Sequence, residues 1–130
     1  MEIVEQIRTT LSLCIGALFG SYLRMQISNY CSCIFSNRFW GTALVNILAC
    51  FLLGIFLAFE SQSRILQQNN ELFVFWSIGF LGSLSTFSTF ILDGINLFNE
   101  RRWKLFLCNM TYSIVGSTIA IFLGFYMAGD

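Results

Sequence analysis

The stretch GFLGSLSTFSTF, residues 79–90, lies in the middle of a long apolar segment and is rich in glycine and hydroxyl residues. Helical spacing places the hydroxyl and the aromatic side chains on two faces: Ser85, Ser88 and Thr89 on one, Phe87 and Phe90 on the other. The glycines just before them favour a break in the helix. Non-helical backbone at membrane depth is tolerated only where protein or a water-filled cavity surrounds it. The stretch therefore predicts a helix broken near its middle, beside a polar site.

The composition of the whole chain is that of a membrane protein. Only 11% of the 130 residues are charged and 56% are hydrophobic, whereas a soluble domain carries about 25% charged residues. Four apolar segments are each long enough to cross a bilayer as a helix, at roughly 10–30, 39–59, 72–98 and 105–127. We expect an all-α membrane protein in which residues 1–130 form a single four-helix transmembrane domain, embedded in the lipid of the cell membrane.

Several other classes of protein are excluded by what the chain contains. The first segment is no cleavable signal peptide, because Glu2 and Glu5 precede it and Arg24 lies near its far end. There is no histidine, no nucleophile–base pair and no cofactor loop, so we expect no enzyme. The formal net charge of +0 gives no reason to expect nucleic acid. The cysteines lack a metal-binding spacing and are interpreted as structural or incidental thiols with no redox or metal role: Cys14, Cys31, Cys33, Cys50 and Cys108.

Polar side chains within the apolar segments are candidates for a functional site. Gly16, Gly20 and Arg24 are four residues apart, which indicates either a helix-packing face with an arginine reaching the interface, or a vestibule cation that attracts anions. Asn46 lies at mid-span, where its amide either makes an interhelical hydrogen bond or points into a pore as a hydrogen-bond donor.

The only acidic residue deep in a span is Asp93, near the end of the third, and a proton-coupled carrier would need such a group at its centre. Neutral donors, an arginine and the positive edges of phenyl rings instead suit a small, hard anion. These residues indicate an anion pathway without selecting the ion.

Three motifs resemble those of the Fluc/CrcB family of fluoride channels. They are GALFGSYLR at 16–24, GTALVN at 41–46 and GFLGSLSTFSTF at 79–90, in the family's order and over nearly the whole chain. The resemblance implies a fluoride-selective channel that exports cytoplasmic fluoride passively and so lowers its toxicity. It also implies an antiparallel, dual-topology dimer with two pores along its interface and a structural sodium ion at its centre.

The resemblance further implies roles for particular residues. Those of the fluoride pathway are Arg24, Asn46, Phe87, Ser88, Thr89, Phe90 and Tyr112, with the ring edges of Phe87 and Phe90 facing the ion. The backbone carbonyls of Gly82 and Ser85 would bind sodium. The glycines and hydroxyls of 79–90 would then unwind the helix so that carbonyls reach a cation and donors reach an anion.

This sequence departs from the family pattern at Ser83, Ser85 and Ala49, where the family usually has glycine, threonine and glycine. Ser83 matters if its position needs a positive φ, which favours glycine. The departures allow an alternative function, that of a non-conducting or obligate partner subunit of a heterodimeric channel. A small multidrug exporter is a further alternative, but it needs a glutamate inside the first span, and Glu2 and Glu5 precede that span.

Positive charges near the span ends indicate orientation. Arg8 and Arg64 fall on one side, and a larger group falls on the other: Arg38, Arg101, Arg102 and Lys104, joined by Arg24 if it lies at the membrane edge. This bias favours termini outside, by a margin small enough for insertion both ways. We therefore expect a homodimer, with a heterodimer of two paralogues as the alternative.

Overall fold

The computed structural model describes residues 1–34, 39–62 and 70–129, and all regular structure in these ranges is helical. In chain order the elements are α1 (Glu2–Ile34), α2 (Phe39–Gln62), α4 (Asn70–Phe73), the π-helix η1 (Val74–Leu81), α5 (Gly82–Leu84), α6 (Phe87–Asn99) and α7 (Trp103–Gly129). The elements from α4 to α6 form one long segment interrupted near its middle. The prediction of an all-helical protein with a broken third helix is confirmed.

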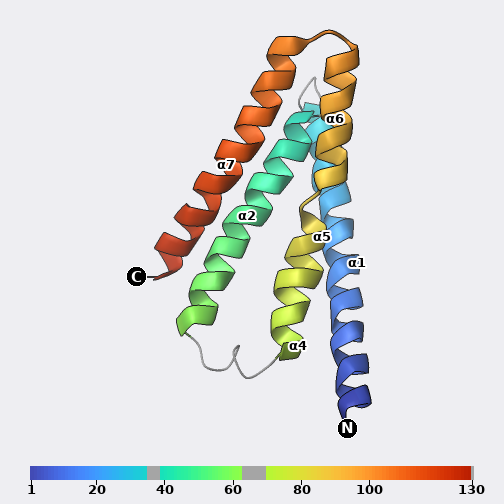
Figure 1. Cartoon of the computed structure of the whole chain (residues 1–130), viewed down its shortest axis with the longest axis vertical. Helices are drawn as coiled ribbons and strands as arrows, with labels where there is room; N and C mark the ends of the chain where they lie inside the picture. Colours follow the sequence, from blue (N-terminus) through green and yellow to red (C-terminus); the bar gives the residue numbers. More distant parts are fainter. Residues whose placement is uncertain (35–38, 63–69, 130) are drawn as a thin grey trace.

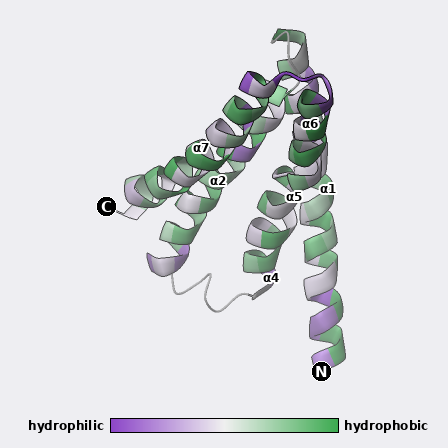
Figure 2. Cartoon of the chain, turned by 45° about the horizontal axis from the view of Figure 1, so that its top comes forward, coloured by the Kyte–Doolittle hydropathy of each residue, from purple (hydrophilic) through white to green (hydrophobic). Residues whose placement is uncertain are grey.

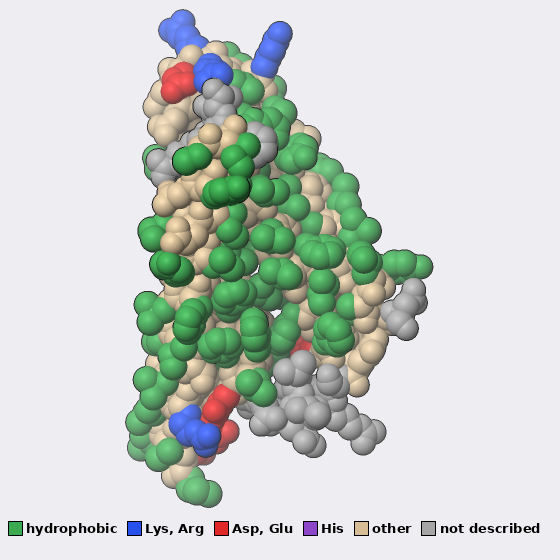
Figure 3. Space-filling model, turned by 180° about the vertical axis from the view of Figure 1, so that it is seen from behind, with side chains coloured by type: hydrophobic (Ala, Val, Ile, Leu, Met, Phe, Trp, Pro, Cys, Tyr) green, Lys and Arg blue, Asp and Glu red, His purple; other side chains and the backbone are tan. Residues whose placement is uncertain are grey.

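Four helices are long and apolar enough to cross a membrane, at Glu2–Cys31, Phe39–Gln62, Glu71–Asn99 and Trp103–Gly129. Figure 2 shows hydrophobic residues along these helices and hydrophilic ones at the start of α1 and at the turn between α6 and α7. On the face drawn in Figure 3, charged side chains gather at the two ends and hydrophobic side chains cover the middle. The chain is a multi-pass membrane protein.

The helices pack as two pairs that meet along the first half of α2, where Thr42 and Asn46 bond to the third segment. α7 runs beside α2 along most of its length, and α1 runs beside η1 and α5 (Figure 1). Where α2 crosses the interrupted segment, Val45, Ala49, Leu81 and Leu84 form a buried apolar cluster. This cluster lies directly before the interruption and fixes the position of α2 relative to it.

Glycines bring α1 and the first half of the third segment into backbone contact. A Cβ atom on Gly16 would lie 2.5 Å from the carbonyl oxygen of Phe75, and one on Gly20 would collide with the carbonyl oxygen of Phe80. Gly16 and Gly20 thus form the helix-packing face that their four-residue spacing predicts. The π-helix η1 lies along this contact. The hydroxyl of Ser77 in η1 donates to the carbonyl oxygen of Phe73, the residue before η1, over 2.6 Å.

A second glycine contact joins α2 to α7. A Cβ atom on Gly54 would collide with the carbonyl oxygen of Ile121, and one on Gly124 with that of Phe51. At the far end of the pair, the amide of Gln62 donates to the carbonyl oxygen of Gly129 over 3.1 Å. These contacts hold the two helices close together without any contribution from the third segment.

The turn between α6 and α7 is closed by backbone hydrogen bonds from Arg101 N to Phe98 O and from Arg102 N to Leu97 O, both of 3.0 Å. This is the Schellman pattern of helix ends, in which the left-handed position is usually glycine. Here Arg101 occupies it, with φ of 56°. Two other arginines of the predicted orientation count, Arg38 and Arg64, lie outside the described residues.

Candidate functional site

The interruption of the third segment lies at Ser85 and Thr86. Ser85 has φ −70° and ψ 153°, and Thr86 has φ −143° and ψ 116°, so both are extended. The break therefore follows the glycines of the motif rather than falling on them. Gly79 is packed against α1, and Gly82 is helical with φ −64°. Gly79 serves helix packing, Gly82 continues the helix, and the backbone leaves the helix only at the hydroxyl residues that follow.

Thr86 caps the helix that follows the break. Its Oγ1 accepts a hydrogen bond from Thr89 N at 3.3 Å and donates to Thr89 Oγ1 at 3.0 Å. Threonine is a favoured N-cap because its oxygen satisfies one of the free N–H groups of the first turn. α6 thus begins at Phe87 with its remaining first-turn N–H groups, and the positive end of its dipole, directed at the break.

Asn46 holds the break from the neighbouring helix α2. Its Oδ1 accepts from Thr86 N at 2.7 Å, and its Nδ2 donates to Thr86 O at 3.1 Å. Of the two roles open to Asn46 from the sequence, this chain makes the interhelical hydrogen bond. The amide keeps a second N–H, and Asn46 also lines a groove beside the break.

That groove has a volume of about 290 Å³ and lies between the break and α7. Its lining residues are Asn46, Cys50, Ser85, Thr86, Phe87, Phe90, Ser113, Ile114 and Ser117. The rings of Phe87 and Phe90 are 6.1 Å apart between centroids. Phe87 is 75% exposed, whereas Phe90 is 8% exposed. We call this hollow the aromatic groove. It combines two phenyl rings, hydroxyls and an amide, and the ring rim, the O–H and the N–H are the positive parts of these groups, which favour an anion.

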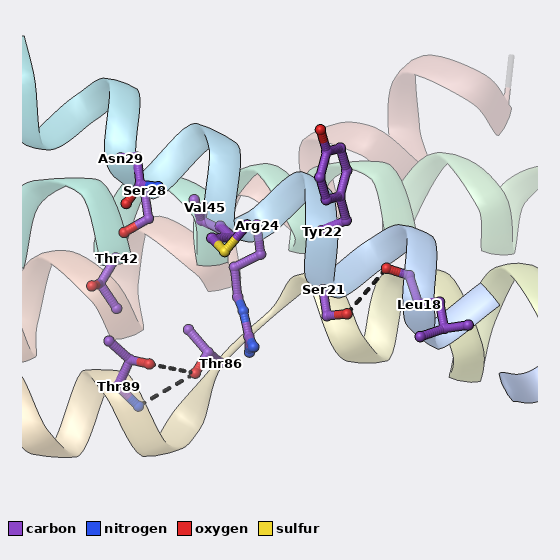
Figure 4. A pocket seen from close by; sticks show the side chains of 11 residues that line it. Leu18, Ser21, Tyr22, Arg24, Ser28, Asn29, Thr42, Val45, Thr86 and Thr89 are labelled. Atoms are coloured by element: carbon purple, nitrogen blue, oxygen red, sulfur yellow. Dashed lines mark hydrogen bonds between the residues drawn. The ribbon is translucent and has the colours of Figure 1, made fainter. Parts of the chain in front are cut away.

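A second hollow, of about 510 Å³, lies on the α1 side of the break and is called here the arginine chamber. It is lined by Leu18, Ser21, Tyr22, Arg24, Met25, Ser28, Asn29, Thr42, Val45, Thr86 and Thr89. Figure 4 shows the Arg24 side chain extending from α1 towards Thr86 and Thr89. Arg24 makes no ion pair with another described residue. Thr86 lines both hollows and is the wall between them.

The structure does not bring all the predicted pathway residues together. Ser88 is exposed and lines neither hollow. Tyr112 is 53% exposed, and its ring packs edge-on against Trp40 at 5.4 Å. Tyr112 directly precedes Ser113, and successive helical residues point about 100° apart, so the tyrosine faces away from the groove while the serine lines it.

Sequence reasoning missed the polar face of α7. Ser113 and Ser117 line the aromatic groove, and Asn109 lies one turn before Ser113. Asn109 and Ser113 are buried, at 2% and 5% exposure, and their side chains have no hydrogen-bond partner among the described residues. The signal was present in the i, i+4, i+8 spacing of these three residues within an apolar segment.

Ser83 does not need glycine's conformational freedom. It lies in the helical turn α5, and Arg101 is the only non-glycine residue with a positive φ in the ranges that the structure describes. Its hydroxyl donates to Phe80 O at 3.1 Å. The serine that replaces the family's glycine therefore sits in an ordinary backbone conformation.

Four membrane-spanning helices, with polar hollows on both sides of a break in the third, define a multi-pass membrane protein whose site lies inside the membrane. The model of the family described as CrcB-like protein, Camphor Resistance (CrcB), matches residues 11–125. The chain belongs to this family, which confirms the resemblance of the three motifs.

Curated relatives cover most of the chain. The fluoride-specific ion channel FluC 1 of Prochlorococcus marinus (strain MIT 9313) is 36% identical over 114 residues, which are 88% of this chain and 87% of the relative. FluC of Pyrococcus abyssi is 35% identical over 127 residues, 94% of this chain and 97% of the relative. FluC of Marinobacter nauticus is 32% identical over 117 residues, 90% and 91% of the two chains. Each of these relatives is named a fluoride-specific ion channel.

Proposed function

We propose that this chain forms a fluoride-specific ion channel that lets cytoplasmic fluoride leave the cell down its gradient. Three relatives that are 32–36% identical to the chain carry that name, and the alignments cover 87–97% of their length. The function is transport rather than catalysis. The observation that carries the proposal within this chain is the aromatic groove, where Phe87 and Phe90 lie beside Asn46 and two serines of α7.

The chemistry of the groove suits fluoride. Fluoride is a small anion with a tightly held hydration shell, so a pathway must replace its water with close donors. Hydroxyls and an amide N–H do so directly, and phenyl edges carry partial positive charge without a full charge that would trap the ion. The N-terminal end of the 13-residue helix α6 adds free N–H groups at the same point.

The pathway we propose runs from the arginine chamber past Thr86 into the aromatic groove and along α7. Arg24 would draw anions into the chamber by its charge. Ser113 and Asn109 continue the line of donors beyond the groove, and their buried polar atoms lack partners among the described residues. Leaving such groups unpaired costs about 1–3 kcal/mol each, so water or the permeating ion is the expected partner.

A dimer is part of the proposal. Phe87, a ring of the aromatic groove, is 75% exposed in the single chain. A second subunit covering it would enclose the groove and exclude lipid from it, and we propose an antiparallel homodimer. Pairing with a paralogue, with this chain as a partner subunit that does not conduct alone, is the alternative. Relatives named FluC 1 and FluC 2 support that alternative, since numbered names imply more than one such protein.

The break also has the groups to hold a sodium ion through backbone carbonyls. Thr86 N bonds to Asn46, so the Gly82 carbonyl lacks its usual helical donor. From the described residues it accepts only a 3.3 Å bond from the Ser85 hydroxyl. Carbonyl oxygens are the ligands that a small hard cation prefers. Gly82 and Ser85 would hold the ion, which would neutralise the carbonyl end of α5. This fit rests on the backbone, so the serine at position 85 is compatible with it.

The direct test is fluoride efflux from proteoliposomes that contain the purified chain alone, followed with a fluoride electrode. Fluoride should leave rapidly after the membrane potential is clamped, and chloride in a matched preparation should not. Absence of fluoride efflux from well-folded protein would overturn the proposal for the chain alone. Efflux that appears only on co-reconstitution with a paralogue would establish the partner-subunit alternative.

A further inference from the structure

The membrane part of the molecule contains a buried carboxylate that the proposed pathway does not use. Asp93 lies in α6, one turn after Thr89, and is 8% exposed. The hydroxyl of Thr42 in α2, itself 3% exposed, donates to Asp93 Oδ2 over 2.7 Å. Asp93 makes no ion pair with any described residue. Among the described residues, Thr42 provides the one hydrogen bond to the Asp93 carboxyl group, and a buried polar group with so few partners calls for a functional reason.

Thr42 connects this carboxylate to the arginine chamber. Three threonines line the chamber: Thr42, Thr86 and Thr89. A hydroxyl has only one hydrogen to donate. Thr42 gives its hydrogen to Asp93, and Thr86 gives its hydrogen to Thr89 Oγ1. Among the hydrogen bonds of the described residues, Thr89 Oγ1 only accepts, so its hydrogen alone of the three is left for an anion in the chamber.

We propose that Asp93 is a positioning residue that, by holding the hydroxyl hydrogen of Thr42, keeps the chamber beside Arg24 a weak anion site. The proposal rests on the proposed fluoride channel function. While its hydroxyl donates to Asp93, Thr42 presents only lone pairs to the chamber and repels an anion there. Arg24 still draws fluoride in, but Thr42 does not help to retain it.

Weak retention is what a conducting pathway requires. An ion must bind well enough to enter and loosely enough to leave. A chamber with an arginine and three donating hydroxyls would hold fluoride too long. Because the hydroxyl hydrogens of Thr42 and Thr86 are already donated to Asp93 and Thr89, the ion is held loosely. It can then pass Thr86, which separates the two hollows, and reach the aromatic groove. Asp93 thus sets the rate of exit from the chamber without touching the ion.

The test is a mutant cycle in which fluoride efflux from proteoliposomes is measured over a range of internal fluoride concentrations. Asp93→Leu removes the acceptor and frees the hydrogen of Thr42. The half-saturating fluoride concentration should fall about tenfold or more, the effect of one added hydrogen bond to an anion, and the maximal flux should fall with it. Damage to folding alone would lower the maximal flux and leave the half-saturating concentration where it was.

The matched control is the double variant Thr42→Val/Asp93→Leu, which replaces both polar groups with apolar ones of similar shape. Most of the shift in half-saturating concentration should disappear, because no hydroxyl remains to hold the ion. An equal shift in the single and double variants would assign the effect to the loss of Asp93 alone and overturn the role of Thr42. An unshifted half-saturating concentration in the single variant would overturn it as well. Where Asp93→Leu does not give folded protein, Asp93→Ala, which also removes the acceptor, is measured in the same way. Failure of the wild-type chain to conduct would count against the proposed function instead.

Discussion

The two halves of the third segment differ in what surrounds them. The first half, from α4 to α5, lies against α1 through glycines that allow backbone contact. The second half, α6, leaves Phe87 three-quarters exposed and borders two hollows. One apolar segment therefore serves as an anchor before Thr86 and as a wall of the pathway after it. Substitutions in the anchor should act on folding, and those in the wall should act on transport.

The largest effect is expected in the anchor. Gly20→Val places a side chain where the Phe80 carbonyl and the Ser83 hydroxyl already lie. Overpacking against backbone should destabilise the protein by about 3 kcal/mol, and little folded material should survive extraction. Gly129→Val is the control, because nothing lies within 4 Å of a Cβ there. Size-exclusion profiles in detergent compare the two, and equal folded yields would contradict the tight contact.

The next effect is expected at the junction of the halves. Asn46→Asp keeps an acceptor for Thr86 N but sets a charged oxygen against Thr86 O, where the amide donated. Loss of one buried hydrogen bond and the new repulsion should destabilise the protein by about 2 kcal/mol. Fluoride flux should be abolished, because the spare N–H is also lost. Thermal unfolding and efflux measure the two parts, and normal flux in folded protein would exclude a role for the amide in conduction.

Within the wall, the two phenylalanines separate transport from stability. Phe→Ile at position 87 or 90 keeps an apolar side chain but removes the ring edge, and flux should fall about tenfold or more in either variant. Phe90 is 8% exposed, so its replacement should also destabilise the chain by about 1 kcal/mol, whereas that of Phe87 should not. Efflux and unfolding temperature are read on the same preparations. Normal flux in both variants would rule out the aromatic groove as the pathway.

The smallest effect is expected at Ser85, on the boundary of the two halves. If the backbone there binds sodium, Ser85→Thr should retain the carbonyl and the 3.3 Å hydroxyl bond to Gly82 O. The free energy of unfolding should stay within about 0.5 kcal/mol of the wild-type value, as for most mild surface changes. Fluoride flux should be unchanged. Sodium dependence of the unfolding temperature, measured against potassium, should also be unchanged. A lost sodium response would contradict sodium binding by the backbone carbonyls at this position.

Much of this arrangement is predictable from sequence because apolar length and spacing act locally. The four spans and the broken third helix follow from composition and from the hydroxyl-rich stretch at 79–90. The packing role of Gly16 and Gly20 follows from their spacing. Contacts between distant segments are harder to foresee. Thr42 and Asp93 are 51 residues apart, and Asn46 and Thr86 are 40 apart.

The position of the break and the role of α7 depend on such distant contacts. Glycine is the stronger local signal for a break, yet Gly79 is needed for packing against α1, and the backbone leaves the helix at Ser85 instead. In α7, one residue of register decides which side chain enters the groove. The larger side chain of Tyr112 suggests a pathway residue in the sequence, but it packs against Trp40, and the Ser113 side chain lines the groove.

The chain contains no proline, so nothing in the covalent backbone forces the third segment to bend. Its break is kept open by Asn46, which belongs to an earlier span and takes the N–H that would otherwise close the helix. During synthesis the third segment should therefore enter the bilayer as a continuous helix and bend only on meeting α2. A peptide of residues 70–100 in micelles should show helical amide signals through Thr86, and a bend there would refute this order of events. Because α2 precedes the third segment in the chain, Asn46 is synthesised before Thr86, so it is already available to bond to Thr86 N when the third segment is made.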